Sequence, residues 1–152
     1  MAAKRKAAAW VAICAACVMS AEGVRTYAYL DPVGIPTICF GETHGVKMGD
    51  KATMDVCKDM LYERLMLVNV GVDKCVHADM SPSRRAAVIS FSYNVGVSAF
   101  CHSTFARKLN DNDPHACNQL YRWTYAHVAG VKVQLPGLVA RRGKEYRLCV
   151  EN

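Results

Sequence analysis

The chain has 152 residues, of which 52% are hydrophobic and 21% are charged, and its formal net charge is +6. This size suits one domain with a buried core, and the composition excludes a disordered chain. The positive charge favours anionic partners, but the basic residues are scattered and no nucleic-acid-binding motif accompanies them, so we expect no nucleic-acid partner.

The N-terminal segment combines a basic start with an apolar run. Lys4, Arg5 and Lys6 precede residues 7–21, which carry no charge; this is the layout of a signal sequence. As a helix the run would span about 22 Å, less than a bilayer core of about 30 Å, so its membrane residence would be marginal. Four interpretations stay open: a cleaved signal peptide, a permanent anchor, a weak anchor that can leave the bilayer, and the first helix of a soluble domain.

Residues 23–46 have a different pattern, in which tyrosine, valine, isoleucine and phenylalanine alternate with glycine and proline. This pattern predicts short strands and tight turns. Thr53 then precedes a long run with apolar residues at helical spacing, which predicts a capped connecting helix.

The second half of the chain contains repeated helix-start signals. They predict four helices. The first begins at Ser81-Pro82 and ends at Gly96, and the second begins at Ser103. The third runs from Asp113-Pro114 through Thr124, and the last begins at Pro136-Gly137. The predicted fold is α+β and mainly helical: a small β-containing N-terminal lobe, a long connecting helix and an all-helical C-terminal lobe. We expect a ligand in a cleft between the lobes.

Three residues near the first predicted strand suggest glycosidic chemistry. Glu22 ends the apolar run, where desolvation favours a neutral acid, and Asp31 lies in a polar turn that keeps it charged. The Thr37 hydroxyl can share a water with Asp31. By spacing alone the set is weak, because a helix-end charge, a turn former and a strand residue explain the three equally well.

Longer ordered motifs resemble the phage-type lysozymes, the family of T-even phage lysozyme. Glu22-Gly23-Val24-Arg25, Tyr29-Leu30-Asp31, the 34–38 segment and Gly41 are similar to that family's catalytic segment. Downstream similarity follows in the same order at residues 91–96, 99–100, 103–104, 108–110, 119–120, 122–123 and 137–142. The similarity covers about residues 22–149, and several ordered motifs are far more specific than a triad.

The resemblance implies a muramidase that hydrolyses peptidoglycan between N-acetylmuramic acid and N-acetylglucosamine, with inversion, to lyse a host cell. In this family Glu22 would be the general acid, Asp31 the base or electrostatic stabiliser, and Thr37 the residue that holds water. No metal and no cofactor are implied. A lytic transglycosylase needs only one acid, so Asp31 and Thr37 argue against it; a non-enzymatic cationic membrane-disrupting or wall-binding protein is the other alternative.

The resemblance also gives expectations for the larger lobe. Asn94, Arg141 and Arg142 are expected at the substrate, with one of the two arginines orienting Glu22. One departure concerns Glu42, which stands where the family commonly has a histidine. Any structural hydrogen bond from that histidine is therefore in doubt.

The N-terminal run resembles that of the signal-arrest-release endolysins of lambdoid phages. These wait inactive at the inner membrane, facing the periplasm, and are then released into it. We therefore expect a membrane segment at 1–21 and a monomeric catalytic domain at 22–152. Residues 7–21 in lipid would hold Glu22 at the membrane surface and keep its helix from docking.

Eight cysteines are many for a reducing compartment and favour an oxidising one. Cys14 and Cys17 have redox-motif spacing but lie in the apolar run; they are expected either to exchange with Cys39 or to act as small apolar membrane residues. Connectivity does not follow from sequence alone. Order and lobe assignment suggest the pairs Cys39 with Cys57, Cys75 with Cys101, and Cys117 with Cys149.

Overall fold

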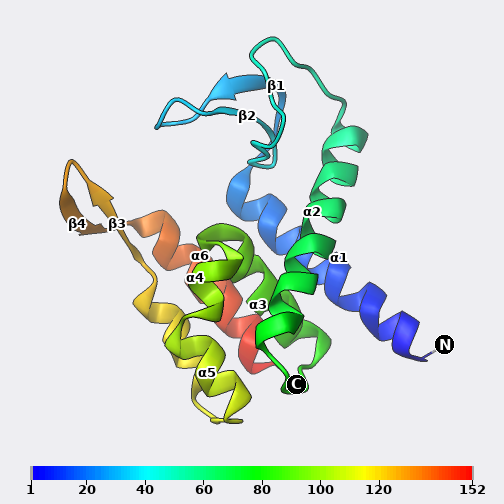
Figure 1. Ribbon diagram of the computed structural model, residues 1–152, viewed down its shortest axis with the longest axis vertical. Helices are drawn as coiled ribbons and strands as arrows, with labels where there is room; N and C mark the ends of the chain where they lie inside the picture. Colours follow the sequence, from blue (N-terminus) through cyan, green and yellow to red (C-terminus); the bar gives the residue numbers. More distant parts are fainter. Residues whose placement is uncertain (1, 152) are drawn as a thin grey trace.

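The computed structural model describes the backbone of residues 2–151 and the side chains of residues 9–151, and it shows the predicted α+β, mainly helical fold. Figure 1 shows a small β lobe at one end, the long helix α2 beside it and a helical lobe below. The helices are α1 (Ala2–Glu22), α2 (Met54–Cys75), α3 (Pro82–Val95), α4 (Val97–Cys101), α5 (Thr104–Asn110), the 3₁₀ helix η1 (Ala116–Arg122) and α6 (Pro136–Val150). The strands are β1 (Arg25–Leu30), β2 (Pro36–Cys39), β3 (Tyr125–Val128) and β4 (Val131–Gln134).

The predicted helix starts are confirmed by their capping hydrogen bonds. The hydroxyls of Thr53, Ser81 and Ser103 accept from backbone N–H groups three residues ahead at 3.2, 3.2 and 3.1 Å. Each cap satisfies a donor that the first turn leaves free, and thereby sets where the helix begins. Gly96 ends α3 as predicted, with a φ of 96° that suits glycine.

One detail of the predicted fold is wrong: the C-terminal lobe is not all helical. The helix expected from Asp113-Pro114 through Thr124 is the shorter 3₁₀ helix η1, and an antiparallel hairpin of β3 and β4 follows it. The hairpin turns at Ala129 and Gly130, whose φ angles are 50° and 79°. Such a two-residue turn usually has asparagine or aspartate before the glycine, because alanine rarely adopts positive φ. The Ala129-Gly130 sequence therefore does not indicate a hairpin turn.

The first helix is part of the core. Helix α1 packs chiefly against α3, and it buries Trp10, Cys14, Ala15 and Val18 together with residues of α2 and α3. Glu22 is its last residue, so the packing of α1 determines where this carboxylate lies. Among the described residues, no helix is both long and apolar enough to cross a bilayer.

Two disulfides attach α2 to β2 and to α4, and a third joins η1 to α6; their pairs are those suggested by the order of the cysteines and by lobe assignment. They join Cys39 to Cys57, Cys75 to Cys101 and Cys117 to Cys149. Cys14 and Cys17 are free and buried in α1. Burial raises the pKa of both thiols, which disfavours the reactive thiolate in this folded state.

Candidate active site

Glu22 is held at the end of α1 by an ion pair with α6. Arg141 Nη1 donates to Glu22 Oε1 at 2.5 Å, and the side chains are 6% and 24% exposed, respectively. A bond to a guanidinium fixes the direction of a carboxylate more firmly than a neutral donor does. The partial exposure of Glu22 leaves this group accessible to a ligand.

A buried network holds Arg141 in turn. Its Nε donates to Glu145 Oε1 at 3.2 Å, and Arg142 Nη1 donates to both oxygens of Glu145 at 2.7 and 2.9 Å. Glu145 is completely buried and also accepts from Ser90 at 3.3 Å. Because both arginines share one carboxylate, the network keeps their positions fixed relative to each other.

The two arginines have different partners outside this network. Only Arg141 contacts Glu22, whereas Arg142 donates to the Trp123 carbonyl at 3.0 Å and to the side-chain oxygen of Asn94. Arg142 is 1% exposed, and its guanidinium donates hydrogen bonds to these protein acceptors. Trp123 packs edge-on against Phe91, with ring centroids 5.2 Å apart. Whether Asn94, Arg141 or Arg142 contacts substrate stays a prediction.

Asp31 and Thr37 belong to one hairpin. Asp31 follows β1, and its Oδ1 accepts from the backbone N–H groups of Val33 and Ile35 at 3.0 and 2.8 Å. Thr37 lies in β2 opposite Tyr29, and its hydroxyl donates to the Ile35 carbonyl at 2.9 Å. Ile35 thus joins the two side chains through its backbone. The turn places both residues in the small lobe, while Glu22 comes from α1.

A hollow of about 590 Å³ lies between the small lobe and the helical lobe; Gly41, Glu42 and Tyr93 are among its lining residues, whereas Glu22, Asp31 and Thr37 are not. A Cβ atom on Gly41 would lie 3.2 Å from Glu22 Oε2 and 4.0 Å from the Tyr93 hydroxyl. Tyr93 donates to the Phe40 carbonyl at 2.6 Å. Burial, and then the charges of Glu22 and Glu42, raise the pKa of Tyr93 and keep it a neutral donor.

Glu42 resolves the departure from the family pattern. It accepts from its neighbours' amides, Thr43 N at 3.1 Å and His44 N at 2.9 Å, and from Arg64 Nη2 of α2 at 3.0 Å. Burial alone would raise the pKa of Glu42, but the bonds from Arg64 and the two amides outweigh it, so the pKa is lowered. At the position where the family commonly has a histidine, Glu42 thus forms an ion pair with Arg64 of α2.

The residues that sequence reasoning missed are those that act through others. Tyr93 lies within the 91–96 motif but was given no role, and Glu145 lies outside the motifs, three and four residues after Arg142 and Arg141. This spacing places the three side chains on one side of a helix and is the signal that could have found Glu145. Among the described residues, no group of three or more His, Cys, Asp or Glu side chains could hold a metal ion.

Comparisons with known proteins agree with this geometry. The family model described as phage lysozyme matches residues 19–145. The chain is 35% identical to the SAR-endolysin of Pseudomonas phage phiKMV over 88% of this chain and 84% of that protein. It is similar to the muramidase domain of SpmX from Asticaccaulis excentricus, with a TM-score of 0.86, 27% identity and coverage of 91% and 95%. For the endolysin from Escherichia coli O157:H7 phage FAHEc1, the TM-score is 0.84, with 28% identity and 91% coverage of each chain.

The family match and the muramidase and endolysin relatives show that the chain is a lysozyme-type glycoside hydrolase, and the fold has one candidate carboxylate on a helix end and a second one in a hairpin turn. The chain belongs to the phage lysozyme family, and its relatives include several SAR-endolysins.

Proposed function

We propose that this enzyme hydrolyses the peptidoglycan glycan strand between N-acetylmuramic acid and N-acetylglucosamine, with Glu22 as general acid. The observation that carries the proposal is the fixed pair of Glu22 and Arg141, of which Arg141 lines a hollow of about 620 Å³. A positioned acid can protonate the leaving oxygen of the glycosidic bond, and a proton donor held in place contributes about 10²–10⁴-fold to rate.

Asp31 and Thr37 are suited to direct the water of an inverting reaction. Both bonds that Asp31 makes in the turn go to Oδ1, so among the described contacts Oδ2 is left for a water. Thr37 is 3% exposed, and its hydroxyl proton goes to the Ile35 carbonyl, so its oxygen can act toward a water only as an acceptor. One oxygen from each side chain could then hold the same water, with Asp31 taking its proton.

Replacement of the acid tests this assignment. Glu22→Gln keeps the shape of the side chain and removes its proton, so reducing-sugar release from purified peptidoglycan should fall at least about 10²-fold while the fold survives. Glu63→Gln, on the exposed surface of α2, is a control that should keep full activity. Full activity of Glu22→Gln would contradict the proposal.

We also propose that the enzyme is first held inactive at the inner membrane through residues 7–21 and is then released to the periplasm as a monomer. In this scheme residues 1–21 are the membrane segment and 22–152 the catalytic domain. The support is that α1 buries Trp10 and Val18 in the core and ends at Glu22, so a helix kept in lipid could not present this carboxylate to Arg141. Relatives named SAR-endolysin favour the same scheme.

Fractionation of producing cells tests the membrane scheme. Before depolarisation, the inner-membrane fraction should contain the chain with little muralytic activity, and depolarisation should transfer both chain and activity to the periplasm. An inner-membrane fraction that is fully active before depolarisation would contradict the scheme, and so would a chain found only in the cytoplasm.

A further inference from the structure

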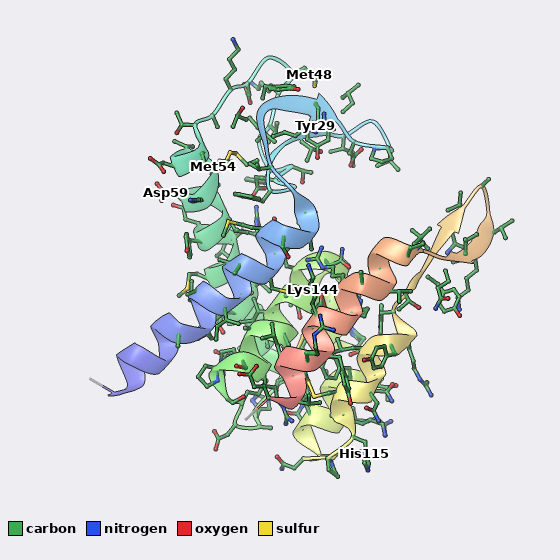
Figure 2. The ribbon with its side chains drawn as sticks, turned by 180° about the vertical axis from the view of Figure 1, so that it is seen from behind. Tyr29, Met48, Met54, Asp59, His115 and Lys144 are labelled. Carbon is green, nitrogen blue, oxygen red and sulfur yellow. A yellow bond between two sulfur atoms is a disulfide. The ribbon has the colours of Figure 1, made fainter. Side chains whose placement is uncertain are left out.

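Both hairpins carry a cation over a tyrosine ring, from the same strand in the first hairpin and from the paired strand in the second. On β1, the Arg25 guanidinium lies over the Tyr29 ring at 4.4 Å from its centroid. On the second hairpin, the Lys132 ammonium lies over the Tyr125 ring at 5.0 Å. Figures 1 and 2 both show the two hairpins projecting to the same side of the molecule. Each hairpin thus offers an aromatic ring with a positive charge attached.

The second hairpin has no packing role that explains its apolar side chains. Tyr125, Val128 and Val131 are 46%, 52% and 62% exposed, and all four residues of β4 are exposed. An isolated two-stranded hairpin is at best marginally stable, and apolar residues gathered on a projecting element mark a binding surface more often than chance. A ligand that covers this hairpin would account for both features.

The base of the second hairpin lies beside the catalytic acid. A hollow of about 620 Å³ is lined by Ala21 at the end of α1, Leu135 after β4, and Arg141. Ala21 directly precedes Glu22, and Arg141 is the ion-pair partner of Glu22. Figure 2 shows Lys144 between α1 and α6, where its Nζ donates to Ser20 at 3.2 Å. Glu22 therefore lies between this hollow and the one lined by Gly41 and Tyr93.

We propose that the β3–β4 hairpin forms a second wall of the substrate site, and that its Tyr125–Lys132 pair and the Arg25–Tyr29 pair each bind an N-acetylmuramic acid unit through its carboxylate-bearing substituent. The inference rests on the proposed function, because it assumes a peptidoglycan glycan strand. An endo-acting enzyme holds several sugar units of the strand at once, and the pair on each hairpin provides a contact for one of them.

The chemistry of the pairs fits this acidic sugar. One face of a pyranose ring presents C–H groups that pack on an aromatic ring, and a tyrosine supplies much area at little entropic cost. Because the cation covers one face of the ring, the sugar packs on the other face, and the cation attracts the carboxylates of the lactyl group or of the attached peptide past the edge of the ring. A neutral N-acetylglucosamine unit offers the C–H face but no carboxylate. Its binding therefore tests the tyrosine of each pair without the cation.

The experiment measures binding without turnover. The Glu22→Gln protein is sedimented with purified peptidoglycan sacculi, and its affinity for a soluble, neutral N-acetylglucosamine oligomer is measured in parallel. Lys132→Gln or Arg25→Gln should weaken sacculus binding about three- to tenfold and leave oligomer binding unchanged. Tyr125→Leu or Tyr29→Leu should weaken binding of both ligands. Tyr125→Phe, which keeps the aromatic ring, should bind both ligands as the protein with Tyr125 does.

Matched controls remove the same groups from α2. Lys58→Gln and Tyr62→Leu make the same chemical changes at exposed positions and should leave both affinities unchanged. The proposal is overturned if Lys132→Gln and Arg25→Gln bind sacculi as Lys58→Gln does, or if they lose oligomer binding equally. If Glu22→Gln still digests sacculi, the proposed catalytic role fails, whereas the binding comparison with the oligomer still decides the role of the hairpins.

Discussion

The Glu22 carboxylate accepts a hydrogen bond of 2.5 Å from Arg141, a residue 119 positions further along the chain. The bond joins the end of the first helix to the last helix, and Arg141 is itself held by the buried Glu145. The Glu22 carboxylate is therefore positioned only when α1 and α6 are packed together. If Glu22 is the acid, as proposed, this dependence links folding of the N-terminal segment to activity.

Arg141→Lys tests this link. A lysine keeps the charge but presents no planar fork, so one ammonium cannot replace the bonds to both Glu22 and Glu145. Loss of one charged hydrogen bond costs about 1.5–3 kcal/mol. We expect kcat to fall about ten- to hundredfold and unfolding to require less free energy. Arg147→Lys, at an exposed position of the same helix, should match wild type in both assays; equal activity of the two variants would refute the link.

Gly41→Ala should disturb the acid directly. Gly41 has a φ of 84°, and an added Cβ would lie 3.2 Å from Glu22 Oε2. The backbone cost for alanine is about 1–2 kcal/mol, and displacement of the carboxylate should lower kcat about tenfold or more.

The control for this variant is Gly49→Ala. Gly49 also has a positive φ, 98°, but its added Cβ would meet nothing within 4 Å. It should show a similar loss of stability, measured by urea unfolding, and normal kcat. Equal kcat in the two variants would show that contact with Glu22 is not what makes glycine necessary at position 41.

Glu42→Gln should alter the pH dependence of stability. The pKa of Glu42 is lowered in the folded state, since the bonds from Arg64 and the amides outweigh burial. The ionised group therefore stabilises the fold above the unfolded pKa of about 4.3, and this contribution is lost as pH falls through the folded pKa. Wild type should exceed Glu42→Gln in unfolding free energy at neutral pH, and the difference should shrink in acid. A difference that is constant with pH would contradict the Arg64 pairing.

Val18→Ala tests whether α1 is part of the cooperative core. Val18 is fully buried one turn before Glu22, and its truncation should cost about 2 kcal/mol. Ala16→Ser, at an exposed position of the same helix, should change stability by less than about 0.5 kcal/mol. In a Trp123→Phe background, Trp10 emission and far-UV circular dichroism should report the same urea midpoint. Separate midpoints would mean that α1 undocks independently.

Local features of the fold could be predicted because their signals are local. Thr53, Ser81 and Ser103 cap the helices that they were expected to cap, since a hydroxyl three residues before a free N–H suffices. The β3–β4 hairpin could not be predicted, because Ala129 holds a positive φ that alanine seldom takes. Pairing with β4 stabilises this turn, and the turn residues alone do not indicate it.

The site could be predicted only in part, for a similar reason. Motif order identified Glu22, Asp31 and Thr37, whose catalytic roles stay proposals. It could not decide between Arg141 and Arg142, which are neighbours on α6 and differ only in what lies opposite them: Glu22 for the first, Asn94 and the Trp123 carbonyl for the second. Such a choice depends on how α1, α3 and α6 pack, which no short pattern encodes.

Mass spectrometry of peptidoglycan digested by wild type and by Glu22→Gln tests the central claim most directly. Wild type should release fragments with reducing N-acetylmuramic acid ends, and Glu22→Gln should release none, because only the wild-type side chain can donate the proton. Anhydro ends from wild type would indicate a lytic transglycosylase. Reducing ends from Glu22→Gln at the wild-type rate, or cell killing by Glu22→Gln without any cleavage, would contradict the assignment of Glu22 as the acid.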